Sequence, residues 1–385
     1  PRHPVTVWWL GRSDCAAVGP AHHSWGTSPP DERAMSTNQT TYLNRLPLDR
    51  FPTDSIVYTT DKGAAVSGDS RELLAALPDD SIDLIVTSPP FALLRKKAYG
   101  NEDQAEYVSW LMEFGEAAHH ALKDTGSLVI DLGGAYQRGV PTRSLYQFRV
   151  LLEFCDTLGY YLAEEFYWHN PSKLPSPIEW VNKRKIRVKD SVNTVWWFAK
   201  TEWPKADVRN VLVPYSDRMK KLLEDPDKYY TPKERPSGHD IAKGFAKDNG
   251  GAIPPNLLQI PNSESNSLYL RHCKTLGKPA HPARFPAELP AFFIRMLTDP
   301  GDVVLDIFAG SNTTGMVAES LDRAWLAFEL DRDYTCLSAV RFMESCRDDT
   351  VEQIYDKLAA GERLHLPDHI DIQLKAPQPK IIPRQ

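Results

Sequence analysis

The chain has 385 residues, 42% of them hydrophobic and 25% charged, which is typical of an ordinary soluble globular protein with one or two domains. Its net charge of −6 argues against a protein that coats nucleic acid indiscriminately, and no apolar run is long enough to span a membrane. The five scattered cysteines form no C-x-x-C pair, so we predict neither a disulfide framework nor a metal site, and we expect a cytoplasmic protein without a secretory signal.

The first stretch of the chain looks unstructured. Residues 1–34 show no sustained periodicity, contain several prolines and glycines, and precede a methionine at position 35. We therefore predict that residues 1–40 are a disordered leader or upstream sequence carried along with the protein. The tetrapeptide Thr-Ser-Pro-Pro occurs here, at 27–30, but no strand precedes it, so we expect no function from this copy.

A second copy of the tetrapeptide, at 87–90, has a different setting. It follows the apolar run of "SIDLIV", which is typical of a strand buried in a parallel sheet. The two prolines end that strand because they cannot continue a hydrogen-bonded ladder. Ligands of open α/β sheets bind just beyond the carboxyl ends of the strands. The peptide Ser88-Pro89-Pro90-Phe91 is thus predicted to lie at an active site.

Helical and strand patterns then alternate along the chain. We predict helices over 106–122, 143–160, 288–299 and 332–346, strands over 126–134, 161–170, 191–200 and 324–331, and a strand–turn–helix unit over 302–321. Such β-α-β alternation indicates a mostly parallel sheet with helices on both faces.

Two segments stand apart by composition. Residues 201–278 are rich in Pro, Asn, Ser and Gly, and a long polar insert in a compact enzyme is usually functional. Residues 173–221 carry twelve Lys or Arg against five Asp or Glu. A concentrated basic patch on an acidic chain is typical of contact with a phosphate backbone, although a solvated surface gives the same pattern.

The motif "VVLDIFAGSNTTG" places a turn of small residues between a strand and a helix. Gly310 allows close approach of a ligand to the backbone, and Glu329, at the end of the next strand, suits the two hydroxyls of a ribose. Met316 stands where a Walker A loop needs lysine, and Phe308 where a dinucleotide fingerprint needs glycine. A nucleoside without phosphates, such as S-adenosylmethionine (AdoMet), remains as the ligand, with a plain helix-capping turn as the alternative.

The order of these motifs, "TSPPF" first and "DIFAGSNTTG" far downstream, resembles that of the β-class amino-methylating DNA methyltransferases. Longer stretches such as "FYWHNPSKLPSPIEWVNKRKIRVK" are similar to cytosine-N4 members of that family. The resemblance implies a Rossmann-like AdoMet-dependent methyltransferase fold, with a mostly parallel sheet, a reversed strand, circularly permuted motifs and a loop-rich DNA-recognition insert. It divides the chain into a catalytic half (41–200), a target-recognition region (201–278), an AdoMet-binding half (279–355) and a C-terminal helix and tail (356–385).

By the same resemblance, residues from both halves bind AdoMet. They are Asp69, Ser70, His281, Pro282, Ala283, Arg284, Phe285, Pro286, Asp306, Phe308, Ala309, Gly310, Ser311, Asn312, Thr313, Thr314, Glu329 and Leu330. Among them, Glu329 is expected to bind the ribose and Asp69 to accept from the adenine amino group. Asp69 also suits the N-cap of the helix in "SRELLAAL", and His281 in its proline-rich turn also suits a purely structural role.

The resemblance makes Ser88, Pro89, Pro90 and Phe91 the catalytic peptide. An acceptor for the amino hydrogens localises the lone pair of the amino nitrogen and directs it at the methyl carbon. The Ser88 hydroxyl and the Pro89 carbonyl are suitable acceptors, and Phe91 offers a flat face to a base swung out of the duplex. Serine at position 88 favours cytosine over adenine, and methylation at C5 lacks its Pro-Cys pair.

We expect double-stranded DNA as substrate, with phosphate contacts that position it and base contacts that read it. The predicted phosphate contacts are Arg95, Lys96, Lys97, Lys183, Arg184, Lys185 and Arg187, and the predicted base contacts are Arg235, Ser237, His239 and Asn249. The resemblance implies a site-specific cytosine-N4 methyltransferase with base flipping, acting at CAGCTG and paired with a restriction endonuclease. The alternatives are an adenine-N6 enzyme of the same fold and a non-catalytic DNA- or nucleoside-binding protein, and the oligomeric state stays open.

Overall fold

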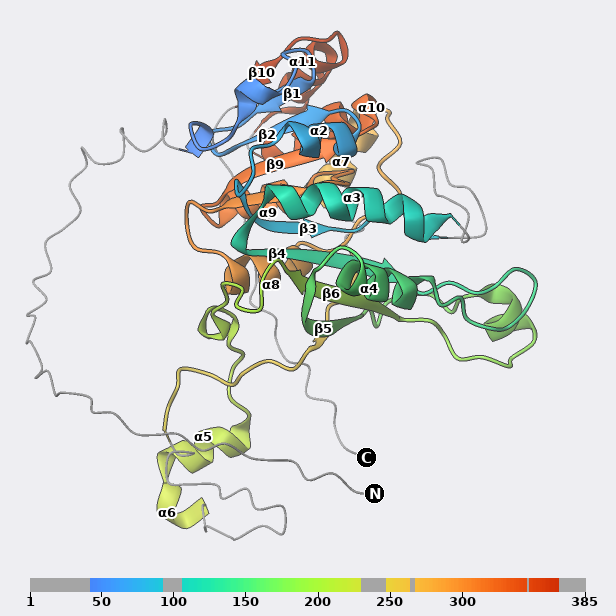
Figure 1. Ribbon diagram of the computed structural model, residues 1–385, viewed down its shortest axis with the longest axis vertical. Helices are drawn as coiled ribbons and strands as arrows, with labels where there is room; N and C mark the ends of the chain where they lie inside the picture. Colours follow the sequence, from blue (N-terminus) through green and yellow to red (C-terminus); the bar gives the residue numbers. More distant parts are fainter. Residues whose placement is uncertain (1–41, 93–105, 230–246, 264–266, 345, 367–385) are drawn as a thin grey trace, which may run out of the picture. The chain divides into compact units, whose positions relative to one another are not determined.

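One sheet organises the fold, and in the computed structural model it has ten strands within the described residues, which are 42–92, 106–229, 247–263, 267–344 and 346–366 (Figure 1). These residues belong to one compact unit. The predicted leader and the tail from 367 onward lie outside them. The strands are β1 (Ile56–Thr59), β2 (Gly63–Ser67), β3 (Ile82–Thr87), β4 (Leu122–Gly133), β5 (Tyr161–His169), β6 (Val192–Ala199), β7 (Leu257–Gln259), β8 (Val303–Asp306), β9 (Ala324–Glu329) and β10 (Leu364–His365).

The strand order is β10-β1-β2-β9-β8-β3-β4-β6-β5-β7. The five central strands from β2 to β4 are parallel, and β6 runs against both of its neighbours, β4 and β5. This confirms the predicted parallel sheet with a reversed strand. Strands β1 and β10 also run against the central strands, which we did not predict because both are very short. The order brings β3 and β8, far apart in sequence, into direct pairing.

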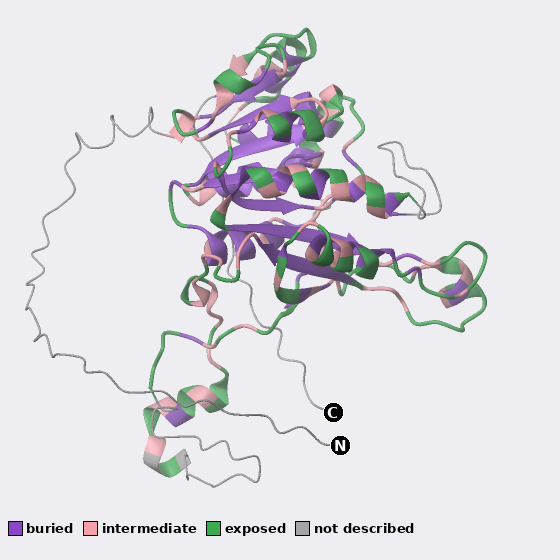
Figure 2. Cartoon of the chain, viewed as in Figure 1, coloured by how far each residue is buried: buried purple, intermediate pink, exposed green. Residues whose placement is uncertain are grey.

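Helices cover both faces of the sheet, as predicted (Figure 1). One face carries α2 (Ser70–Ala76), α3 (Tyr107–Ala121) and α4 (Tyr146–Asp156), and the other carries α7 (Leu268–Thr275), α8 (Glu288–Leu297), α9 (Thr313–Ser320), α10 (Arg332–Ser338) and α11 (Asp348–Ala359). Side chains alternate between the faces along a strand, so Ile85 joins one core while Leu84 and Val86 join the other. Figure 2 shows buried residues along the strands and exposed ones on the outer helix surfaces.

Several predicted boundaries differ from the structure. The helix predicted over 143–160 is limited to α4, and the one over 332–346 ends with α10 and continues as a 3-10 turn, Ala339–Phe342. The predicted recognition region contains α5 (Asp217–Glu224) and α6 (Pro226–Tyr229). In the described ranges, no helix combines the length and apolar content that crossing a bilayer requires.

Part of the predicted recognition region belongs to the sheet and its core. Strand β7 pairs with β5, with Leu258 opposite Trp168, and Tyr269 and Cys273 of α7 are buried in the core. Residues four apart on a helix share one face, so this pair packs inward although its surroundings are polar. Sequence composition concealed both elements because β7 contains only two apolar residues and α7 only four, within a polar region.

Candidate active site

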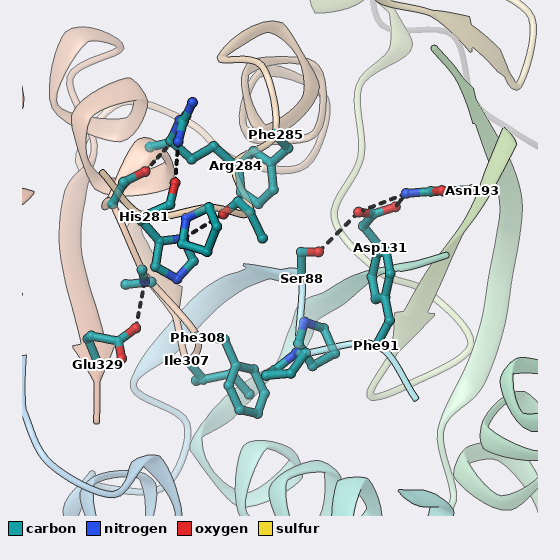
Figure 3. Close-up of a pocket in the computed structure, with 18 of the residues that line it drawn as sticks. Ser88, Phe91, Asp131, Asn193, His281, Arg284, Phe285, Ile307, Phe308 and Glu329 are labelled. Carbon is teal, nitrogen blue, oxygen red and sulfur yellow. Dashed lines mark hydrogen bonds between the residues drawn. The ribbon is translucent and has the colours of Figure 1, made fainter. Parts of the chain in front are cut away.

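A cavity of about 560 Å³ opens at the carboxyl ends of the parallel strands (Figure 3). Each of these strands supplies a lining residue at or just beyond its end: Asp69 after β2, Ser88 after β3, Asp131 from β4, Phe308 after β8 and Glu329 from β9. The predicted catalytic peptide (88–91) and the turn between β8 and α9 (307–312, the glycine turn) therefore line one cavity, as the sequence predicted. Parallel strands produce this meeting because their carboxyl ends lie at the same edge of the sheet.

Most of the predicted cofactor-binding and catalytic residues line the cavity, and four of them do not. Those that line it are Asp69, Ser70, Ser88, Pro89, Pro90, Phe91, His281, Pro282, Ala283, Arg284, Phe285, Phe308, Ala309, Gly310, Ser311, Thr313, Glu329 and Leu330. Those that do not are Pro286, Asp306, Asn312 and Thr314. The latter three are buried polar residues whose bonds are internal to the protein.

The predicted catalytic peptide is held by Asp131, which is held in turn by Asn193, and neither residue was predicted. Ser88 Oγ donates a hydrogen bond to Asp131 Oδ2 over 3.0 Å, and Asn193 Nδ2 donates to Asp131 Oδ1 over 3.0 Å. Phe91 packs against Gly133, where a Cβ atom would lie only 2.3 Å from the ring. Because the Ser88 proton points at Asp131, the lone pairs of the serine oxygen are free to accept a hydrogen bond from the cavity.

The Asp131 carboxyl is buried, and this burial raises its pKa to about 6. The hydrogen bonds from Asn193 and Ser88 lower the pKa, but burial has the larger effect. At neutral pH the group is therefore mostly ionised, yet close enough to its titration to accept a proton. Such a group suits general base chemistry, since the best catalytic pKa lies near the working pH.

The buried carboxylate of Asp306 links the predicted catalytic peptide to the predicted cofactor-binding turn. Its carboxylate accepts hydrogen bonds from Thr87 Oγ1 and Thr314 Oγ1, each over 2.7 Å, and from the backbone N–H of Phe308 over 3.1 Å. Thr87 immediately precedes the predicted catalytic peptide, Phe308 belongs to the glycine turn, and Thr314 lies in the first turn of α9. Burial raises the pKa of Asp306, but three donors surround the carboxylate. Asp306 thus positions the residues around it, and its side chain does not line the cavity.

The glycine turn is held against the ends of β8 and β9. The backbone N–H of Gly310 donates to Glu329 Oε2 over 2.7 Å, and burial raises the pKa of that carboxyl. Gly310 has φ +52°, and a Cβ atom there would lie 2.9 Å from the ring of His281. His281 is fixed in turn, with its Nδ1 2.7 Å from the carbonyl oxygen of Ala283. The turn thus requires glycine for both its backbone angle and its close packing.

One wall of the cavity is aromatic. Phe308 packs against Trp110 and Phe114 of α3, with ring centroids 5.6 and 4.8 Å apart. Asp69 lies beside this wall, where it caps α2 through the backbone N–H of Arg71 and also pairs with the Arg71 guanidinium. The hydrogen bond from the Arg71 side chain lowers the pKa of Asp69. The predicted helix cap is therefore confirmed, and Asp69 also lines the cavity.

Other residues that line the cavity were not predicted, and they come from helices, strands and loops. They are Arg71, Trp110, Phe114, Asp131, Trp168, Asn170, Lys173, Ser191, Asn193, Asn262 and Ile307. A signal existed for Asp131, a lone carboxylate in the apolar run "SLVIDLG" at the end of a predicted strand. The aromatic pair on α3 has the four-residue spacing of an ordinary core face, so nothing distinguished it.

The predicted DNA contacts fall partly outside the described residues: the phosphate contacts Arg95, Lys96 and Lys97 do, and so do the base contacts Arg235, Ser237 and His239. In the segment between β5 and β6, Lys183 and Arg184 both pair with Glu179, at 3.3 and 2.9 Å, and Arg187 donates to the Pro141 carbonyl. Exposed ion pairs of this kind contribute little to stability, so these cations could exchange their partners for DNA phosphates. The exposed cations here are Lys183, Arg184, Lys185 and Arg187, and Asn249 is exposed in the recognition region.

A family model described as DNA methylase matches residues 82–339, which include the catalytic peptide and the glycine turn. The chain belongs to the DNA methylase family. Among curated relatives, the type II methyltransferase M.PvuII of Proteus hauseri is 63% identical to this methylase over 310 residues, which are 80% of this chain and 92% of the relative. The type II methyltransferase M.ScaI of Streptomyces caespitosus is 25% identical over 74% of this chain and 82% of its own.

A solved structure named PvuII DNA methyltransferase (cytosine-N4-specific) superimposes on this methylase with a TM-score of 0.66 and 52% identity, covering 81% of this chain and 97% of that one. The Rossmann-like methyltransferase fold expected from the resemblance is thereby confirmed. This methylase is a DNA methyltransferase, and its cofactor is S-adenosylmethionine.

The cavity fits this cofactor in three respects. Phe308 presents a flat apolar face suited to an adenine ring, and Glu329 presents a carboxylate suited to two ribose hydroxyls. Gly310 leaves the turn without a side chain, so the cofactor can approach the backbone closely.

Proposed function

We propose that this methylase transfers a methyl group from AdoMet to the N4 amino group of cytosine in double-stranded DNA, with the target base swung out of the duplex. The observation that carries the proposal is the Ser88 hydroxyl, which lines the cavity and donates its proton to Asp131, so that its oxygen can accept a hydrogen bond from a substrate. The 63% identity to M.PvuII and the likeness to a structure named cytosine-N4-specific support the same target atom.

In this proposal AdoMet lies along the β8–β9 side of the cavity. Glu329 accepts from the ribose, Phe308 and the α3 aromatic residues stack on the adenine, and Asp69 accepts from the adenine amino group. Turn residues 281–285 then border the methionine portion. When bound, the cofactor supplies an electrophilic methyl group on a positively charged sulfur, so the leaving group is already activated and the protein needs no strong base.

The target cytosine occupies the β3–β4 side, next to the catalytic peptide. Its amino group donates to Ser88 Oγ and the Pro89 carbonyl, which localises the nitrogen lone pair. As the nitrogen loses a proton, Ser88 can accept it while passing its own to Asp131, whose pKa of about 6 lets it take that proton transiently. Phe91 supplies the apolar face against which the base stacks.

The basic segment 183–187 and the cations around 95–97 would hold the phosphates, and the recognition region would read bases. We propose CAGCTG as the recognition sequence and a restriction endonuclease as functional partner, since M.PvuII is named as a type II methyltransferase. A cytoplasmic location follows from this role, because the host DNA to be protected lies there.

The product of the reaction tests the function. Incubation with AdoMet and plasmid, followed by digestion to nucleosides, is expected to yield N4-methylcytosine, and the plasmid is expected to resist a nuclease that cuts CAGCTG. N6-methyladenine in the digest would replace the proposed target atom, and absence of any methylated nucleoside would favour a binding protein without turnover. N4-methylcytosine with complete cleavage would leave the chemistry intact and rule out the CAGCTG site.

Replacement of Glu329 by glutamine is expected to raise the KM for AdoMet by about tenfold to a hundredfold, because hydrogen bonds to a charged acceptor contribute about 1.5–3 kcal/mol each. The kcat should change far less, since the ribose lies away from the methyl group. The matched control is Glu319→Gln, a buried carboxylate on α9 that bonds Thr60 and Trp325 away from the cavity. A similar rise of KM in both variants would contradict the ribose assignment.

A further inference from the structure

The segment that joins β5 to β6 walls the cavity beside the catalytic peptide. Because β5 and β6 are antiparallel neighbours, with Trp168 opposite Asn193, both ends of this segment reach the same edge of the sheet. Three of its residues line the cavity, Asn170, Lys173 and Ser191, together with Trp168 near the end of β5 and Asn193 near the start of β6. Neither the catalytic peptide nor the AdoMet assignments account for this wall.

Most of the polar side chains in this wall already form hydrogen bonds with other groups of the protein. The Asn193 amide donates to Asp131, and the Asn170 side-chain oxygen accepts from the backbone N–H groups of Ser172 and Asn262, at 3.0 and 3.1 Å. The Asn262 amide donates to the carbonyl of Arg284 over 2.7 Å. These side chains build the wall and fix its position, so they have few groups left to bind a substrate.

Lys173 is the exception. Its backbone is held on both sides: the N–H donates to the Asn170 carbonyl over 3.2 Å, and the carbonyl accepts from Lys189 Nζ over 3.1 Å. Its ammonium group makes no hydrogen bond and no ion pair with any residue that the structure describes. The charge is close enough to act on Asp131, whose pKa it helps to lower. Lys173 is therefore a half-buried cation with a fixed backbone and free N–H donors. It lies on the side of the cavity where the target cytosine is proposed to bind.

We propose that Lys173 selects cytosine by donating a hydrogen bond to the keto oxygen O2 of the target base; this inference rests on the proposed function. Cytosine presents an amino group, N3 and O2 along one edge, whereas adenine presents an amino group, a ring nitrogen and a C–H group. With the amino group held at Ser88, an ammonium donor farther along the wall distinguishes the two by the keto oxygen. A site built to bond a substrate acceptor rejects an analogue that lacks it.

The test compares two duplexes that differ only in the target base, cytosine or adenine, each placed opposite an abasic position so that base pairing is equal. The wild-type methylase is expected to favour cytosine strongly in kcat/KM. Lys173→Met keeps most of the side-chain volume and is expected to lower kcat/KM on cytosine by about tenfold to a hundredfold, the range for one charge-assisted hydrogen bond, with little change on adenine. Lys173→Arg should recover part of the preference.

Lys183→Met is the matched control, because it removes the same charge from the same segment at an exposed position outside the cavity. It is expected to weaken both substrates equally and leave their ratio unchanged. An unchanged ratio in Lys173→Met, or equal losses on both bases together with a shifted pH profile, would overturn the inference while leaving cytosine methylation standing. A wild-type enzyme that prefers adenine would overturn the proposed function, and the inference with it.

Discussion

Asp131→Asn is expected to lower kcat by about 10²- to 10⁴-fold while the KM for AdoMet stays close to wild type. That range is typical when a positioned proton acceptor is removed. In the wild type, Asp131 accepts from both Ser88 and Asn193, so its charge orients the serine proton away from the substrate. An amide offers one acceptor and a competing donor, and the donor would occupy the serine lone pairs that the cytosine amino group needs.

The pH dependence of the wild-type enzyme checks the same assignment. The active form of Asp131 is the carboxylate, and burial raises its pKa to about 6, so kcat should be lost as the pH falls through about 6. The Asp131→Asn variant should lack this acidic limb. Its control is Asp83→Asn at the opposite end of β3, where the carboxylate bonds Lys123 and the N–H of Val303; it should cost stability and leave kcat intact. Full kcat in Asp131→Asn would show that Ser88 acts without its partner.

Asp306→Ala is expected to destabilise the protein by about 3–5 kcal/mol, seen as a fall in Tm of roughly 10 °C, and to abolish measurable AdoMet binding. The substitution leaves three buried donors without an acceptor: Thr87 Oγ1, Thr314 Oγ1 and the N–H of Phe308. The turn that carries Phe308 would then lose its link to β3. Thermal denaturation and isothermal titration with AdoMet measure the two effects.

Single-partner variants separate the two sides of this junction. Thr314→Val removes a partner on the cofactor side, and Thr87→Val removes one on the catalytic side; each should cost about 1–2 kcal/mol. Combined with Asp306→Ala, neither should add its full cost, because the hydroxyl has already lost its acceptor. Strict additivity would contradict the shared carboxylate, as would normal AdoMet affinity in Asp306→Ala.

The sequence predicted best what depends on continuous apolar strands. The runs that form β3 and β8 are buried on both faces, so they stand out, and the motifs that follow them meet because parallel strands end together. Asp131 and Asn193 could not be paired in the same way. Their contact depends on the antiparallel register in which Gly133 lies opposite Asn193, and a single sequence carries no signal for that register.

The aromatic wall of the cavity and strand β7 at the edge of the sheet were not predicted, for other reasons. Trp110 and Phe114 lie on one helix face with the spacing of ordinary core residues, so only tertiary packing against Phe308 shows their role. Strand β7 has three residues inside a polar stretch, and it becomes a strand by pairing with β5 rather than by its own propensity.

The pairing of β5 with β6 bears on how such enzymes diversify. His169 and Val192 are paired neighbours, so the chain from 170 to 191 leaves and re-enters the sheet at adjacent points. A longer, shorter or foreign stretch between those points is expected to leave the strand register unaltered, together with the β8–β9 side that we propose holds the cofactor. Lys173 and the basic segment 183–187 both lie in this stretch. Exchange of the stretch would therefore change the target-base preference and the phosphate contacts together, while the rest of the methyltransferase stays the same.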